Sequence, residues 1–95
     1  MQQTLLHSKR KQILSIAKRH GVTSIRVFGS AARGEARPDS DIDFIVEVGP
    51  KRSPWFPAGL QRDLETLLGV RVDIVTPNGL HWYIREKALA ESRPL

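Results

Sequence analysis

The stretch FGSAARGEARPDSDIDFIV, residues 28–46, decides the fold and contains the residues best suited to binding or catalysis. Asp41 and Asp43 open an apolar run, separated by a single isoleucine. Because side chains alternate between the two faces of a strand, both carboxylates should lie on one face and the apolar residues on the other. Gly29 and Ser30 follow the short run SIRVF and precede Asp41 by ten intervening residues. The stretch therefore predicts two strands joined by a turn that begins at Gly29.

Patterns on either side of this stretch predict alternating helices and strands. Apolar spacing and Gly at helix ends predict helices, and runs rich in β-branched residues predict strands. Helices are expected over 4–20, 30–35, 58–68 and 80–91, and strands over 24–28, 41–48 and 70–75. The order predicts one α/β (α+β) domain over 1–95, with a mixed sheet of three or slightly more strands and about four helices. Helical crossovers favour parallel pairs, whereas the short link after Phe28 leaves the direction of that pair open.

Composition limits the classes of function that are open to the chain. It has 95 residues, no cysteine and a net charge of +5. Disulfides and thiolate metal sites are excluded, and the charge favours an anionic partner. The sequence has no signal-peptide core and no apolar run that could span a membrane, so a cytoplasmic protein is expected. Direct nucleic-acid binding is disfavoured because only Trp55 and Phe56, near Lys51 and Arg52, combine aromatic with basic residues.

A third carboxylate, Asp73, lies in the middle of the predicted strand 70–75. An unpaired charge there is costly, so Asp73 either forms a salt bridge, for example with Arg71 or Arg26, or has a functional role. If its strand pairs beside 41–48, Asp73 can project to the face of Asp41 and Asp43. With oxygen ligands only, Mg²⁺ or Mn²⁺ is the expected metal.

Gly29, Ser30 and Arg33 could supply a phosphate site beside this metal site. Glycine allows a backbone to approach a ligand closely, and a helix beginning at Ser30 would direct free N–H groups at an anion. Each feature alone is more often structural: a turn, a strand start or a surface arginine. Together they predict a nucleoside triphosphate site, where two metal ions would stabilise the incoming and leaving oxygens at phosphorus.

The motif Gly29-Ser30, ten residues, Asp41-x-Asp43 resembles the signature of the minimal nucleotidyltransferases of the polymerase-beta-like superfamily. The segments ARG at 32–34, SDID at 40–43 and VDIVT at 72–76 also fit. The resemblance implies that Gly29 and Ser30 hold the triphosphate of ATP. It also implies that the aspartates ligate two Mg²⁺ ions, with Asp73 as third carboxylate.

Short chains of this kind are similar to the antitoxins of MNT–HEPN toxin–antitoxin pairs. That similarity implies transfer of AMP from ATP to a tyrosine of a HEPN-type RNase toxin, within a hetero-oligomer or homo-oligomer. A different class of function is an antitoxin that neutralises its partner by binding alone. Transfer to RNA or to a small molecule is a third alternative.

Several other polar and aromatic residues are expected to have no site role. His7, His20 and His81 lack ligand spacing and are predicted at the surface. Asp63 and Glu65 are predicted on the solvent side of an amphipathic helix. Of Trp82 and Tyr83, one is expected to pack inward, and the other could mark a partner surface.

Overall fold

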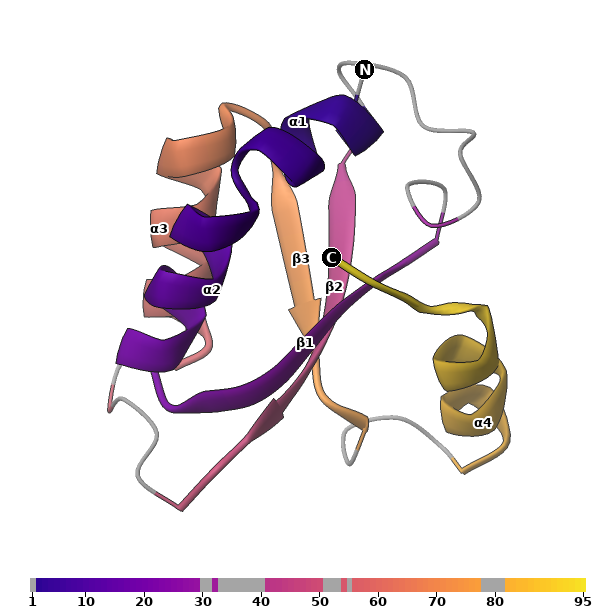
Figure 1. Ribbon diagram of the computed structural model, residues 1–95. Coiled ribbons are helices and arrows are strands. Elements are labelled where there is room, and N and C mark those ends of the chain that lie inside the picture. Colours follow the sequence, from indigo (N-terminus) through magenta and orange to yellow (C-terminus); the bar gives the residue numbers. More distant parts are fainter. Residues whose placement is uncertain (1, 30–31, 33–40, 51–53, 55, 78–81) are drawn as a thin grey trace.

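From α3 (Ala58–Leu68) onward helices and strands alternate, as the sequence predicts, whereas two helices and then two strands come before α3 in the described part of the chain (Figure 1). The computed structural model describes residues 2–29, 32, 41–50, 54, 56–77 and 82–95. Its elements are α1 (Gln2–Ser8), α2 (Arg10–Arg19), β1 (Val22–Phe28), β2 (Ile42–Val48), α3 (Ala58–Leu68), β3 (Val72–Val75), α4 (Trp82–Glu91) and β4 (Arg93–Pro94). In the part of the chain that is described, every helix is too short or too polar to traverse a bilayer.

The strands form one mixed sheet in the order β3-β2-β1-β4. β1 pairs with β2 in antiparallel orientation, which answers the question left open by the short link between them. β2 and β3, joined through α3, are parallel, as a helical crossover predicts. β4 pairs antiparallel with the outer side of β1 and was not predicted. The expected α/β class with a mixed sheet is therefore confirmed, with one additional short strand.

Helix prediction was less accurate at the N-terminus than in the centre of the chain. The single helix expected over 4–20 is two helices, separated at Lys9, where φ is −101° and ψ is 8°. Backbone hydrogen bonds from Lys9 to Leu5 and from Ile13 to Lys9 still cross the break. No glycine or proline marks this position, so the sequence pattern gives no sign of it. The helix expected over 30–35 falls outside the described residues except for Ala32.

The hydrophobic core lies on one face of the sheet, under α1, α2 and α3 (Figure 1). Ile42, Phe44 and Val46 of β2 are completely buried on this face, with Ile25 and Val27 of β1 beside them in register. The helices contribute an apolar stripe each, including Ile13, Ile16, Ala17, Leu60, Leu64 and Leu68. The alternation of β2 thereby turns its remaining side chains, including that of Asp43, toward the opposite face.

α4 is attached to the sheet by a polar cluster. The Arg26 guanidinium donates hydrogen bonds to the Ser92 Oγ at 2.7 Å and to the Ser92 carbonyl at 3.1 Å. The Ser92 hydroxyl in turn donates to the carbonyl of Leu89 at 2.7 Å. Arg26 pairs with Ile45, which lies two residues from Asp43 along β2. Arg26 therefore lies on the same face of the sheet as Asp43. The link between α4 and β4 is thus held at the face that carries Asp43.

The apolar side chains of α4 do not form a single buried stripe. Within the helix only Ala88 is buried, whereas Trp82 and Tyr83 are 60% and 63% exposed. Their rings contact each other edge to face, with centroids 6.2 Å apart. The expectation that one of these two rings packs inward is therefore wrong. Ile84 and Leu89 of the same helix are exposed as well, so α4 does not turn one apolar face toward the sheet.

We expect Ser92→Ala to lower the free energy of unfolding by about 1–2 kcal/mol, because it removes two side-chain hydrogen bonds from a buried position. Urea denaturation followed by circular dichroism measures this change. Ser8→Ala is the control, since the Ser8 hydroxyl makes an exposed local bond to Leu5. Equal stability losses in the two variants would contradict the role assigned to the Arg26–Ser92 cluster.

Candidate active site

Two of the predicted carboxylates are direct neighbours across two strands. Asp43 on β2 and Asp73 on β3 are register partners in the parallel pair. Neighbouring strands of a sheet lie about 4.7–4.9 Å apart. Asp43 is partly buried and Asp73 is exposed. β3 thus pairs beside β2, which is the condition under which Asp73 could project to the face of Asp43.

Gly29 brings the end of β1 against the Asp43 carboxylate. Phe28 is the register partner of Asp43, and Gly29 follows with a φ of +74°, in the left-handed region. A Cβ built on Gly29 would lie 2.5 Å from the Asp43 Oδ2. Only glycine combines this conformation with such a close approach. The turn predicted at Gly29 thus begins directly beside the carboxylates.

The structure gives less information on the other predicted site residues, Asp41, Ser30 and Arg33. Asp41 is exposed and directly precedes β2. Ser30 and Arg33 lie outside the described residues. Among the residues that are described, no three histidine, aspartate or glutamate side chains stand close enough together to hold a metal ion. The roles of Asp41, Ser30 and Arg33 stay predictions.

The donor set around Asp43 and Asp73 fits a hard divalent cation. Two like charges directly opposite each other on a sheet destabilise it, and a bridging cation reverses that effect. Carboxylate oxygens are the ligands that Mg²⁺ and Mn²⁺ prefer. Because Gly29 has no side chain, the Asp43 Oδ2 lies directly against the backbone of the turn. Asp43 and Asp73 would therefore hold the ion together, with Asp41 as a further predicted ligand.

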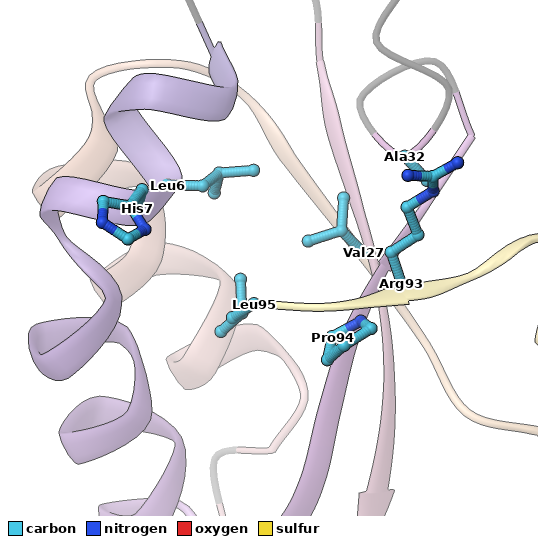
Figure 2. A pocket seen from close by; sticks show the side chains of 7 residues that line it. All are labelled: Leu6, His7, Val27, Ala32, Arg93, Pro94 and Leu95. Carbon is cyan, nitrogen blue, oxygen red and sulfur yellow. The ribbon is translucent and has the colours of Figure 1, made fainter.

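A pocket of about 200 Å³ lies behind this site, on the other face of the sheet (Figure 2). Val27 lines it, and its register partner Phe44 belongs to the core face, opposite Asp43. Leu6, Pro94 and Leu95 make the walls largely apolar, and Arg93 extends toward Ala32. None of the predicted carboxylates is among the described residues that line the pocket, whereas Ala32 of the segment after Gly29 is.

Three polar residues assigned to the solvent surface make specific contacts instead. The side chain of His20 is only 12% exposed, and its Nε2 lies 2.8 Å from the Asp63 Oδ2. Glu65 accepts a backbone hydrogen bond from Val72. The surface prediction for His20 was therefore wrong, and Glu65 is partly buried by its contact, because helical periodicity does not identify tertiary partners. Asp63 keeps the solvent side that was predicted for it, since its side chain is 46% exposed. His7 is exposed as predicted. Outside the described residues lie His81, Lys51, Arg52 and Trp55.

Comparison with known proteins identifies the family of this chain. A model of the nucleotidyltransferase domain matches residues 9–95. The chain belongs to the nucleotidyltransferase domain family. The resemblance seen in the Gly29-Ser30 and Asp41-x-Asp43 motif is confirmed, and the family is one of enzymes.

Members of the nucleotidyltransferase family align with nearly the whole chain. The protein adenylyltransferase MntA of Thermococcus cleftensis is 38% identical over 94% of this chain and 87% of its own length. A candidate protein adenylyltransferase of Methanocaldococcus jannaschii is 37% identical over 87% of this chain and 89% of its own. Among solved structures, a candidate minimal nucleotidyltransferase has a TM-score of 0.85 and 50% identity, covering 95% of this chain and 92% of that one.

A more distant structure has the same fold. A toxin–antitoxin crystallised with AMP-PNP superposes with a TM-score of 0.74 at 20% identity, over 88% of this chain and 69% of that one. At this identity the likeness concerns the fold alone. The four-stranded arrangement is therefore shared beyond the range of clear sequence similarity.

Proposed function

We propose that this nucleotidyltransferase transfers AMP from ATP to the hydroxyl group of a tyrosine on a HEPN-type RNase toxin, and that it acts as the antitoxin of that toxin. The observation that carries the proposal is the direct pairing of Asp43 with Asp73 beside the left-handed Gly29. The relatives named protein adenylyltransferase support a protein acceptor. The toxin as acceptor follows from the resemblance to MNT–HEPN antitoxins.

In the proposed reaction the acceptor oxygen attacks the α-phosphorus of ATP, a new P–O bond forms, and pyrophosphate leaves. The acceptor hydroxyl loses its proton, and the neighbouring Asp73 carboxylate is the candidate group that favours this loss. When bound, Mg²⁺ supplies positive charge that stabilises the phosphate oxygens. Asp43 and Asp73 hold the ion, with Asp41 as third predicted ligand.

The turn after β1 is the proposed triphosphate site. Because Gly29 has no side chain, the Asp43 carboxylate lies against the turn. A triphosphate bound at the turn would therefore lie next to an ion held by Asp43. Ser30 adds a hydroxyl and Arg33 a guanidinium in this proposal. The net charge of +5 favours binding of the polyanionic nucleotide.

Label transfer tests the proposal. The protein is incubated with Mg²⁺, α-labelled ATP and lysate of its source organism, alongside the Asp41→Asn/Asp43→Asn variant. We expect label on one protein, absent with the variant, and mass spectrometry should locate AMP on a tyrosine. Label on RNA or on a small molecule would replace the acceptor.

The same experiment separates catalysis from neutralisation by binding alone. An antitoxin that only binds would leave every species unlabelled while still capturing its partner, and the Asp41→Asn/Asp43→Asn variant would capture it equally well. That result would overturn the proposed transferase activity. We expect instead that the variant loses the ability to neutralise the toxin in growing cells.

A further inference from the structure

A carboxylate outside the candidate site, Glu65 of α3, acts directly on the strand that carries Asp73. Its Oε2 accepts a hydrogen bond from the backbone N–H of Val72 at 3.0 Å, in a partly buried position. Val72 is the first residue of β3, and Asp73 is the second. The contact therefore holds the peptide group between Arg71 and Val72, one residue before Asp73.

The sheet register explains why Val72 needs a partner from a helix. Among the described strands β3 lies at the edge of the sheet and pairs with β2 alone. Ile42, the register partner of Val72, donates its N–H to the carbonyl of Arg71 at 2.9 Å. In a parallel pair only one residue of each register pair bonds to the neighbours of its partner. Ile42 is that residue here, so the N–H of Val72 points away from β2. The same alternation turns the N–H of Asp73 toward β2.

Glu65 thus occupies the side of β3 where a further strand would otherwise bind. A hydrogen bond to a charged acceptor is roughly twice as strong as one between neutral groups. The start of β3 is therefore held from two sides, by β2 and by α3. β3 has only four residues, so a shift at its first residue moves Asp73 relative to Asp43.

We propose that Glu65 is a positioning residue, whose hydrogen bond to Val72 fixes the start of β3 and keeps the Asp73 carboxylate opposite Asp43. The inference rests on the proposed role of Asp73 as a metal ligand. Glu65 itself binds neither metal nor nucleotide. Partners of this kind, one step behind a ligand, typically change metal affinity or activity by roughly 10–100-fold when removed.

Three variants separate positioning from simple stabilisation. Glu65→Ala removes the acceptor, whereas Glu65→Gln retains an oxygen that can accept from Val72. Asp63→Ala is the matched control, because Asp63 lies on the same helix and loses a contact to His20 rather than to β3. Mn²⁺ binding in the presence of a non-hydrolysable ATP analogue is measured by electron paramagnetic resonance, together with the melting temperature and the rate of AMP transfer.

We expect Glu65→Ala to weaken Mn²⁺ binding about tenfold and to slow AMP transfer by a similar factor. Glu65→Gln should restore both to near the wild-type values. Asp63→Ala should lower the melting temperature while leaving Mn²⁺ affinity unchanged.

If Glu65→Ala binds Mn²⁺ as tightly as the wild-type protein, the inference is overturned. It is also overturned if Glu65→Ala and Asp63→Ala lose affinity equally. If the wild-type protein binds Mn²⁺ but transfers no AMP, the proposed function fails. The weaker binding of Glu65→Ala would then still support the positioning role. A wild-type protein that binds no Mn²⁺ would overturn both.

Discussion

Asp43→Asn should reduce AMP transfer on the order of 10³-fold, the largest change that we expect from a single substitution in this chain. A metal ion contributes several kcal/mol to stabilising charge at phosphorus, and each 1.36 kcal/mol corresponds to about a tenfold change in rate. Asparagine keeps the shape of the side chain but not its charge. Single-turnover transfer of labelled AMP to the purified acceptor gives the rate.

Glu47→Gln provides the control for Asp43→Asn. Glu47 is an exposed residue of the same strand and the same face, about 13 Å from Asp43 along β2. It undergoes the same change from carboxylate to amide and should retain wild-type activity. Asp43→Asn should still fold, which circular dichroism checks. More than a tenth of wild-type activity in folded Asp43→Asn would exclude Asp43 as an essential ligand.

Gly29→Ala should reduce AMP transfer by about 10²-fold, the loss typical of a displacement of about 1 Å in a catalytic group. The new methyl group would lie 2.5 Å from the Asp43 Oδ2, so the carboxylate must move. Alanine at a φ of +74° also destabilises the folded chain by about 1–3 kcal/mol. The loss of transfer is expected in the folded variant, so it should persist at a temperature at which Gly29→Ala is fully folded.

Gly69→Ala isolates the backbone contribution to this effect. Gly69 has nearly the same φ, +73°, but a Cβ there would meet nothing within 4 Å. Both variants should show similar losses in urea denaturation, whereas Gly69→Ala should keep its transferase activity. If the two variants lose activity equally, the contact between residue 29 and Asp43 is not responsible.

The parts of the site that follow from strand periodicity could be predicted from the sequence. Alternation about Asp43 identifies the face it occupies, and a helical crossover makes β2 and β3 parallel. These two rules suffice to place Asp73 beside Asp43. The position of Gly29 after β1 likewise follows from a local turn signal.

Features that depend on distant partners could not be predicted in this way. β4 consists of Arg93 and Pro94, which have no strand propensity and pair with β1 only because the chain returns there after α4. His20 and Asp63 come together because α2 packs on α3. Glu65 looks like any polar residue of an amphipathic helix until the edge of β3 is known. In each case tertiary structure, rather than local pattern, selects the contact.

The two paired aspartates lie on strands that differ in local stability because of their places in the sheet. β2 has a strand on each side, whereas β3 is a four-residue edge strand. Edge segments open in sub-global fluctuations at lower free energy than the strands between them, so amide hydrogen exchange should be slower in β2 than in β3. Fraying of β3 would separate Asp73 from Asp43 without global unfolding. A ligand that bridges both carboxylates would oppose this opening and selectively protect the β3 amides, linking occupancy of the site to order at one edge of the sheet.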